Sequence, residues 1–441
     1  MSQPSTRPPE TPPDATAPLR DVAGLAGHLF RHEAGKLVSV LTGIFGMERL
    51  QLAEDVVQEA LVRALQTWPY YGIPKNPAAW LTQTAKHLAL DVVRREKVFR
   101  EKEPAIAASI EQWPAESIAG SEPTFEDEIQ DDRLRLMFAC CHPLLPAEAQ
   151  TALALKTLCG FSPAEIAKAF LTSEAAIAKR LTRARQRLHE LHVRFEIPAG
   201  EELASRLDGV LQTLYLLFNE GYKASTGDSL LREELCSEAI RLASLLARHA
   251  VGNQPRTHAL LALMLLNAAR LAARVDPAGN VLRLKEQNRA RWDHAMIARG
   301  MRHLAQSAGG DELSEYHLQA GIAACHCAAQ EYDATDWRQI LSLYDLWMER
   351  TDSPVVALNR AVAMAKVHGP QAGLDAIGAI RDREPLESYY LYYSVLAEFE
   401  AEVEDYALAA QHLRQALKFT EVTSERTFLS KRLAECEAHL S

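Results

Sequence analysis

The stretch that decides the fold is residues 160–191, GFSPAEIAKAFLTSEAAIAKRLTRARQRLHEL. Ser162 and Glu165 have the spacing of a capping box, with proline at the first helical position between them, which predicts a short helix. Thr172 or Ser173 can cap a second helix a few residues later. The stretch therefore predicts two helices joined by a tight turn.

The second of these predicted helices is amphipathic and basic. Its apolar residues recur at steps of three and four, and they are Ile177, Leu181, Ala184 and Leu188. Its cations lie elsewhere on the helix, and they are Lys179, Arg180, Arg183, Arg187 and, on a flank, Arg185. This layout predicts a helix-turn-helix whose second helix enters the major groove, where several cations meet phosphates. A solvated basic helix packed on a bundle is the alternative, because such patterns give false positives in helical proteins.

Upstream, residues 51–68, QLAEDVVQEALVRALQTW, predict an amphipathic helix. Its apolar face is expected to include Leu52, Val56, Val57 or Ala60, Leu61, Ala64 and Leu65. Its exposed side carries an acidic, amide-bearing stripe of Glu54, Asp55, Gln58 and Glu59. From the residues alone, a solvated helix face explains this stripe better than a docking surface does.

The residues that follow combine aromatic rings with cations. Pro69, Gly72, Pro74 and Pro77 predict a loop in which Tyr70 and Tyr71 are candidate stacking platforms. A helix is expected from about residue 78 to 102, with Trp80, Leu81, Ala85, Leu88 and Val92 buried and with a basic end of Arg94, Arg95, Lys97, Arg100 and Lys102. Because rings stack on unpaired bases and cations follow the backbone, this segment suits single-stranded nucleic acid.

The composition of the whole chain sets the outer limits. With 441 residues and 48% hydrophobic content, it has room for two or three domains with real cores, and it is not a disordered or disulfide-stapled protein as a whole. Strand patterns are almost absent, so we expect an all-α fold. Seven cysteines and no apolar run long enough to span a bilayer favour the reducing cytoplasm, with no membrane partner.

The net charge of −10 argues mildly against nucleic-acid binding, but the acidity is unevenly distributed. Residues 1–200 hold 23 Lys and Arg against 25 Asp and Glu, a net of −2, and the remainder holds 25 against 33, a net of −8. The basic helices thus lie in the less acidic part of the chain. Local charge decides what a phosphate meets.

Composition shifts divide the chain into five parts. We expect a disordered tail at 1–18, a helical module at 19–102, a flexible acidic linker at 103–132, a helix-turn-helix module at 133–197 and a helical domain at 201–441. In the last part, residues 353–380 and 386–420 repeat a helix–turn–helix arrangement at a spacing of about 34–36 residues. That period is typical of tetratricopeptide repeats, which present a concave surface to a protein or peptide.

Three blocks in this order, AEDVVQEAL, PAAWLTQTAKHLALDVVRRE and GFSPAEIAKAFLTSEAAIAKRLTRARQRL, resemble an extracytoplasmic-function sigma factor of the sigma-70 superfamily. The resemblance covers roughly residues 20–195, with region 2 at 19–102 and region 4 at 133–197. The C-terminal half resembles the extension of a subgroup with tetratricopeptide-like domains, which implies a regulatory role for it. The implied partners are core RNA polymerase, through its β′ clamp helices and β flap, and promoter DNA.

The resemblance also implies roles for individual residues. Polymerase binding falls to Glu54, Asp55, Gln58 and Glu59, so the stripe becomes a docking surface. Recognition of the −10 element falls to Tyr70, Tyr71, Lys75, Asn76, Lys86, His87, Arg94 and Arg95. Reading of the −35 element falls to Ser173, Glu174, Ala176, Lys179, Arg180 and Arg183. Many family members have Arg-Asn where this chain has Lys86-His87, a departure that bears on base preference at the −10 element.

Other functional classes fit the sequence less well. No glycine-rich phosphate loop, GxSxG elbow or HExxH motif occurs, so we expect no catalytic residues, no cofactor and no enzyme activity. The clusters 140–142 and 325–327 contain cysteine and histidine without the spacing of a zinc site, so core cysteines are expected rather than a metal. The rival functions are a helix-turn-helix regulator with a repeat-type sensing domain, and a scaffold whose repeats bind peptides.

Overall fold

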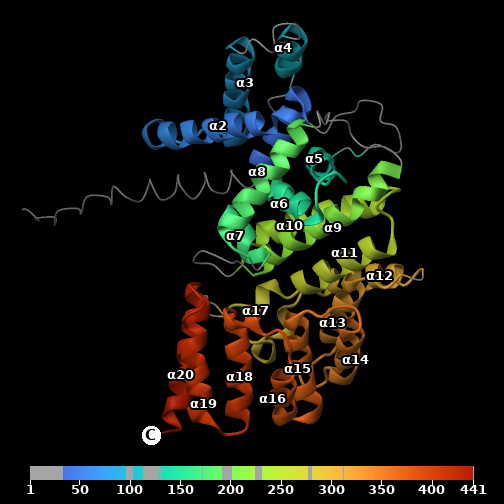
Figure 1. Cartoon of the computed structure of the whole chain (residues 1–441), viewed down its shortest axis with the longest axis vertical. Helices are drawn as coiled ribbons and strands as arrows, with labels where there is room; N and C mark the ends of the chain where they lie inside the picture. The colour runs from blue at the N-terminus through green and yellow to red at the C-terminus, as the bar shows by residue number, and fades with distance from the viewer. Residues whose placement is uncertain are drawn as a thin grey trace, which may run out of the picture. The chain divides into compact units, whose positions relative to one another are not determined.

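The computed structural model describes residues 33–95, 103–112, 129, 131–170, 172–190, 201–223, 231–276, 281–310 and 312–440. Within these ranges the chain forms α-helices and short 3-10 turns and no β-strand, apart from one isolated bridge between Val275 and Val281 (Figure 1). The all-α prediction is confirmed. The expected tail at 1–18 lies outside the described residues.

The chain divides into two compact units, which we describe separately. Unit 1 comprises Met1–Phe161 and Arg180–Pro198, and unit 2 comprises Ser162–Lys179 and Ala199–Ser441. Unit 1 contains a helix over residues 33–45, followed by η1 (Met47–Arg49), α2 (Leu50–Tyr71), α3 (Pro77–Arg95), α4 (Glu103–Gln112), α5 (Asp132–Cys140) and α6 (Ala147–Cys159). The larger part of α8 (Glu174–Glu190) also belongs to unit 1.

Helix α2 continues past Pro69, where the sequence predicted a loop. It ends only at Gly72, whose φ of 83° lies in the left-handed region and whose N–H donates to the Trp68 carbonyl at 2.9 Å. A proline inside a helix removes one backbone hydrogen bond and crowds the preceding turn, but in the last turn there is little helix beyond it to disrupt. Tyr70 and Tyr71 therefore stand on the final turn of a helix.

Residues 103–112, which the sequence placed in a flexible linker, form helix α4. Ile110 is completely buried, and α4 packs against α3. Burial of one isoleucine contributes on the order of 2 kcal/mol, which holds this short helix on its neighbour. The rest of the expected linker, apart from residues 129, 131 and 132, lies outside the described residues, as does the expected basic end at 96–102.

Unit 2 begins with α7 (Pro163–Ala169) and the first turns of α8. Its long helices follow, and they are α9 (Glu201–Tyr222), α10 (Glu233–Arg248), α11 (Pro255–Ala268), α12 (His294–Ser307), α13 (Glu315–Ala328) and α14 (Trp337–Met348). The last group is α15 (Pro354–His368), α16 (Pro370–Gly378), α17 (Glu384–Glu387), α18 (Tyr390–Glu402), α19 (Tyr406–Ala416) and α20 (Thr423–Ala438). The 3-10 turns η3 (Leu271–Ala273), η4 (Leu284–Glu286) and η5 (Arg289–Arg291) connect α11 to α12.

The last group forms successive helix hairpins that lie side by side (Figure 1). Ala361 of α15 and Ala397 of α18, which the predicted repeat aligns, are both buried. Gly373 of α16 allows close approach, because a Cβ there would lie 2.7 Å from Ala365 Cβ and from the Phe399 ring. The structure thus contains the paired helices that the repeat predicts.

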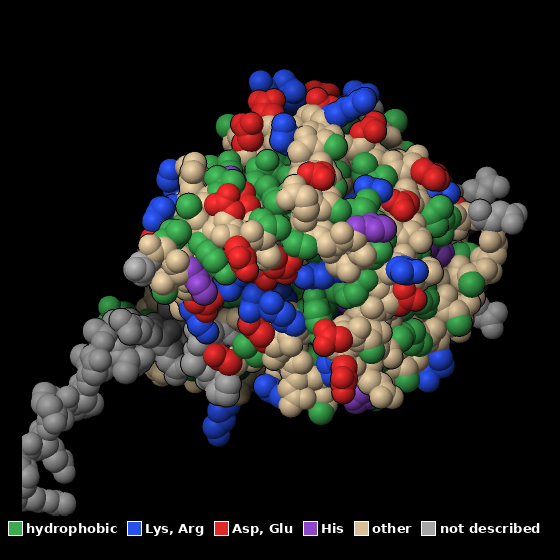
Figure 2. Space-filling model, turned by 90° about the horizontal axis from the view of Figure 1, so that it is seen from below, with side chains coloured by type: hydrophobic (Ala, Val, Ile, Leu, Met, Phe, Trp, Pro, Cys, Tyr) green, Lys and Arg blue, Asp and Glu red, His purple; other side chains and the backbone are tan. Residues whose placement is uncertain are grey.

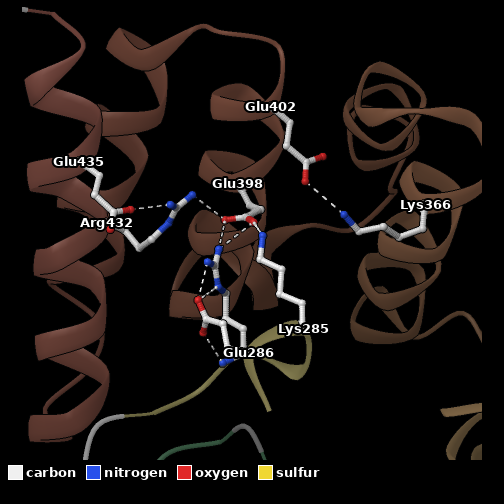
Figure 3. A network of polar contacts seen from close by, with 8 residues as sticks. Lys285, Glu286, Lys366, Glu398, Glu402, Arg432 and Glu435 are labelled. Atoms are coloured by element: carbon white, nitrogen blue, oxygen red, sulfur yellow. Dashed lines mark hydrogen bonds and ion pairs between the residues drawn. The ribbon is translucent and has the colours of Figure 1, made fainter. Parts of the chain in front are cut away.

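Ion pairs fasten these hairpins to one another (Figure 3). Glu398 of α18 accepts hydrogen bonds from Arg432 of α20 at 2.8 Å, from Arg283 at 3.1 Å and from Lys285 at 3.5 Å. Lys366 of α15 reaches Glu402 of α18 at 3.1 Å. Burial raises the pKa of Glu398, but these cations outweigh it and hold that pKa below its ordinary value. On the face in Figure 2, acidic and basic side chains are likewise interspersed.

Candidate nucleic-acid and protein interfaces

Three of the four residues expected to bind polymerase lie on one exposed face of α2. Asp55, Gln58 and Glu59 are exposed at helical steps of three and four residues. Gln51 donates to Asp55 at 2.9 Å, and Arg63 pairs with Glu59 at 3.0 Å. Exposed pairs of this kind contribute little to stability, so the carboxylates are available to a partner.

The same face continues into two exposed apolar side chains, Val62, for which the sequence predicted no role, and Leu65, which the sequence placed on the buried face. Val62 and Leu65 are 44% and 46% exposed. The prediction that Leu65 belongs to the buried face was therefore wrong. The series 55, 58, 62, 65 follows a period of about 3.5 residues, and counting along it from Asp55 would have found both side chains. The face thus combines an acidic half with an apolar half.

Glu54 is not on this face. Only 6% of it is exposed, and its two oxygens accept hydrogen bonds from Thr157 of α6 at 2.7 Å and from Arg185 of α8 at 2.8 Å. Residue 54 shares its side of α2 with the buried Val57 and Leu61, at steps of three and seven. The structure therefore places Glu54 away from the exposed face, and its role in polymerase binding stays a prediction.

Near Glu54, helices from the early and late parts of unit 1 pack into one core. The helix over residues 33–45 packs so closely on α6 that a Cβ on Gly35 would lie 2.4 Å from the Leu158 carbonyl oxygen. Ser39 on the same helix donates to the Asp132 carbonyl at 2.6 Å. Beside these contacts η1, α2 and α8 line an open pocket of about 340 Å³. Close packing and hydrogen bonds thus hold these helices together, while the space beside them is not fully packed with side chains.

Among the described residues, two tyrosines expected at the −10 element are the most exposed large hydrophobic side chains. Tyr70 and Tyr71 are 85% and 86% exposed, so their rings are free to stack on bases. Lys75 and Asn76 are exposed in the following turn. The Asn76 side chain accepts the Ala79 N–H at 3.0 Å and so caps α3, which ties that amide to a structural role.

On α3, the remaining candidates for the −10 element divide into exposed and covered residues. His87, Arg94 and Arg95 are exposed, and His87 lies 3.0 Å from the Gln83 amide nitrogen. Lys86 is covered, with its ammonium 3.5 Å from the Glu111 carbonyl oxygen of α4. Burial lowers the pKa of Lys86. Helix α4 therefore covers Lys86 in this structure, and its role in DNA recognition stays a prediction.

The helix-turn-helix predicted from residues 160–191 is present locally. Ser162 and Glu165 form the expected capping box on α7, and Ser173 caps α8 by accepting the Ala176 N–H at 3.3 Å. Burial raises the pKa of Glu165, but hydrogen bonds from Ser162 and the charge of Arg232, 2.9 Å away, lower it below its ordinary value. All four predicted apolar positions are buried, namely Ile177, Leu181, Ala184 and Leu188.

The residues expected to read the −35 element differ in exposure along α8. Ser173, Glu174, Lys179 and Arg183 are exposed, and Ala176 is half-buried. Arg180 is half-buried and pairs with Glu148 of α6 at 2.6 Å, so its charge is already compensated. Lys179 and Arg183 are therefore the two cations of this set best placed to meet phosphates.

The cysteine clusters have the character of core residues. Cys140 and Cys141 are fully buried, and burial raises the pKa of Cys140 well above its ordinary value, with Cys141 adding to the effect. Cys325 and Cys327 are partly buried on α13. Over the described ranges, no three His, Cys, Asp or Glu side chains converge as a metal site would require. No helix in the same ranges has both the length and the apolar character to cross a membrane.

Comparison with protein families matches three segments of the chain. Residues 29–98 match sigma-70 region 2, and residues 135–188 match sigma-70 region 4. Residues 206–308 match a family of unknown function, DUF6596, and not a tetratricopeptide repeat family. The assignment of the C-terminal half to tetratricopeptide repeats therefore stays a prediction, although its helices are paired.

Two curated proteins are similar to the chain. An uncharacterized protein of Rhizobium meliloti is 39% identical over 355 residues, which cover 78% of this chain and 81% of that protein. The ECF RNA polymerase sigma factor SigE of Mycolicibacterium smegmatis is 29% identical over 138 residues, which cover 31% of this chain and 51% of that factor. No solved structure matches the chain.

Proposed function

Because the chain belongs to the sigma-70 family and is a sigma factor for transcription initiation, we propose that it acts as an extracytoplasmic-function sigma factor. It binds core RNA polymerase in the cytoplasm and directs it to promoters with particular −10 and −35 elements. The observation that carries this proposal is the pairing of region 2 and region 4 in one chain, since a simple DNA-binding regulator needs no region 2. The protein performs no covalent chemistry, and RNA synthesis belongs to the polymerase.

Polymerase docking uses the exposed face of α2. Asp55, Gln58 and Glu59 supply charge and hydrogen bonds to the β′ clamp helices, while Val62 and Leu65 supply apolar area. Charged groups at an interface set orientation and encounter rate, and buried apolar groups slow dissociation. In the closed arrangement Glu54 is not available for this docking, because its two oxygens accept hydrogen bonds from Thr157 and Arg185.

Recognition of the −10 element uses the end of α2 and the exposed side of α3. Tyr70 and Tyr71 stack on unpaired bases of the opened strand. This stacking favours melting because it stabilises the single-stranded DNA. Arg94 and Arg95 attract the phosphates of the DNA backbone. His87 is the exposed member of the Lys86-His87 pair and is the one that reaches a base edge.

Recognition of the −35 element uses α8. Its N-terminal end, capped by Ser173, carries Glu174, Ala176 and Lys179 toward base edges, and Arg183 contacts a phosphate. The hydrogen bond between Glu54 and Arg185 packs the C-terminal part of α8 against α2. Since the two promoter elements lie apart on the duplex, we infer that this packing loosens when both are bound. The β flap of the polymerase is the proposed holder of region 4 in the opened form.

Unit 2 is proposed to regulate the factor. Its helix hairpins provide the kind of surface on which a protein or peptide docks, as the predicted repeats imply. The alternative function, a helix-turn-helix regulator with such a binding domain, requires α7 and α8 but assigns no role to the exposed face of α2.

Transcription from genomic DNA fragments by core polymerase, with and without the purified full chain, tests the proposal. We expect the protein to bind core polymerase and to start transcripts downstream of one shared pair of sequence elements. Asp55→Ala should weaken core binding by about tenfold, the loss of a good interfacial contact worth ~1.4 kcal/mol. Asp352→Ala, an exposed acid of unit 2, is the matched control and should bind normally.

Two results would contradict the proposal. Absence of any complex with core polymerase would rule out a sigma factor. Specific binding to the same DNA sites with no polymerase present, together with normal core binding by Asp55→Ala, would favour the conventional regulator instead.

A further inference from the structure

Unit 2 contains a cavity of about 620 Å³ that no comparison assigns to a function. We propose that it binds a small organic acid, a molecule with a carboxylate or phosphate on an aromatic or apolar body. Residues from α9, α11, α13, α14 and α15 line it, so a bound molecule would touch five helices. The volume lies in the range of small-molecule sites, which commonly occur between helices.

The walls of the cavity suit such a molecule on two sides. The aromatic side comprises Tyr215, Tyr222, Tyr344 and Trp347, with the last two rings stacked at 6.0 Å. The polar side offers amides and hydroxyls, among them Asn267, Gln319 and Asn359. An apolar lining with a few convergent polar groups is the usual composition of a ligand site.

The cation of the cavity wall is Arg270, which lies between the end of α11 and the start of η3. Its guanidinium donates to the Tyr222 hydroxyl at 3.0 Å and to the Asn267 side-chain oxygen, and it lies 5.9 Å from the centre of the Trp292 ring. Its Nε is buried with no hydrogen-bond partner. All of these contacts are to neutral groups.

Two further guanidinium groups lie close to Arg270. Arg274 stacks 3.8 Å over the Tyr222 ring, and Arg289 donates to the His326 and Ala329 carbonyls at 2.6 Å each. Burial lowers the pKa of both Arg274 and Arg289, and repulsion from Arg270 lowers each further. Within the described ranges, none of the three arginines forms an ion pair with a carboxylate.

This excess of positive charge sets the cluster apart from the other dense cluster of charges in unit 2. Around Glu398, four cations face four carboxylates, so that network is neutral by itself (Figure 3). The Arg270 cluster has no such internal counter-charge. The three arginines are half-buried. A cation partly removed from water without a counter-ion is costly, and an anion in the cavity would supply the missing partner.

His326 on α13 adds a second unsatisfied polar group. It lines the cavity, and its Nδ1 is buried without a hydrogen-bond partner. Burial and the charges of Arg270 and Arg289 keep this imidazole neutral, so it offers one donor and one acceptor. Glu315 is the acid among the lining residues. It is exposed, so it lies at the solvent-accessible edge of the cavity.

The experiment measures binding of simple acids to the full chain by ligand-observed NMR at millimolar concentration. The probes are benzoate, phenyl phosphate and indole-3-acetate, with benzamide and indole-3-acetamide as uncharged matches. We expect the acids to bind at least tenfold more tightly than their amides. Arg270→Gln should weaken acid binding by about tenfold or more and leave amide binding unchanged. Arg338→Gln, an exposed arginine of unit 2, is the control and should bind as the parent does.

Three outcomes would overturn the proposal. Failure of every acid to bind would exclude an anion site in this cavity. Equal binding of acids and amides would exclude charge recognition. Unchanged acid binding in Arg270→Gln would place the anion elsewhere, and circular dichroism and thermal melting of that variant confirm that it is folded. None of these outcomes depends on whether the chain binds polymerase.

Discussion

Replacement of Glu54 by alanine is expected to destabilise unit 1 by about 3–5 kcal/mol, because it leaves Arg185 partly buried without its counter-ion. Arg185→Ala should have a similar effect, and the double variant should lose less than the sum of the two. Urea unfolding followed by circular dichroism measures these changes. Glu59→Ala, an exposed acid five residues further along the same helix, serves as control and should change stability by less than about 0.5 kcal/mol. Equal effects at the two positions would refute the structural role of Glu54.

His326 predicts a pH dependence of the stability of unit 2. Burial, then repulsion from Arg270 and Arg289, lowers its pKa from 6.5 to about 3. Folding depresses the pKa of His326, so its neutral imidazole adds to the stability of unit 2 above the pKa of the unfolded chain. That contribution is lost as the pH falls from the unfolded pKa toward the folded one. Between about pH 7 and pH 5 the loss from this group should be about 2 kcal/mol.

The control for this effect is His326→Asn, which cannot titrate. The stability of the variant should fall less than that of the parent over the same pH interval, with the difference measured by urea unfolding at each pH. Parallel falls would show that the imidazole is protonated in the folded protein.

At the residue scale, the type of side chain was predictable from the sequence but its exposure was not always so. Asp55, Gln58 and Glu59 lie on the exposed face as expected. Glu54 and Lys86 do not, because helices distant in sequence, α6, α8 and α4, cover them. Charged residues are seldom buried, so a single sequence gives no signal that a particular one is paired inside.

At the scale of single helices, α8 provides the sharpest test of DNA reading. Arg183→Ala should weaken initiation at the cognate promoter and lower the slope of log affinity against log salt by about 1, the signature of one lost phosphate contact. Core polymerase binding should stay unchanged. Arg180→Ala should have the smaller effect on salt dependence, because Glu148 already neutralises it. If Arg180→Ala changed the slope of log affinity against log salt more than Arg183→Ala does, this assignment would be contradicted.

Helix ends and short helices mark the limit of what local patterns predict. The capping box at Ser162 fixed the start of α7 because its two hydrogen bonds are local. Helix α2 passing Pro69, and α4 forming at residues 103–112, depend on packing that no local pattern reveals. In α4 the fully buried side chain of Ile110 outweighs a surrounding composition that favours a linker.

At the scale of the molecule, the shared core of unit 1 predicts a change on binding polymerase. If region 2 and region 4 separate, the buried contacts of Thr157 and Arg185 with Glu54 must break. Hydrogen exchange of the amides in α6 and in the C-terminal part of α8 should then become faster in the complex with core polymerase and promoter. The exposed face of α2 should become better protected in the same experiment. Unchanged exchange in α6 and α8 would show that unit 1 stays closed.

The order of modules along the chain was predictable at this scale, and their packing was not. The sequence blocks placed region 2 before region 4, and the family matches agree. That helices of both blocks share a core within unit 1 rests on contacts between residues over 100 positions apart, such as Thr157 with Glu54. The cavity near Arg270 could not be predicted from the sequence either, because its lining residues come from five helices.

The buried position of Glu54 has a consequence for genetics. A search for variants that fail to transcribe would recover substitutions at Glu54 alongside those at Asp55, two neighbours in one acidic stripe. The Glu54 alleles should be temperature-sensitive, with low protein abundance, because a loss of a few kcal/mol raises the unfolded fraction that proteases degrade. The Asp55 alleles should accumulate at normal levels and, when overproduced, compete poorly for polymerase at every temperature.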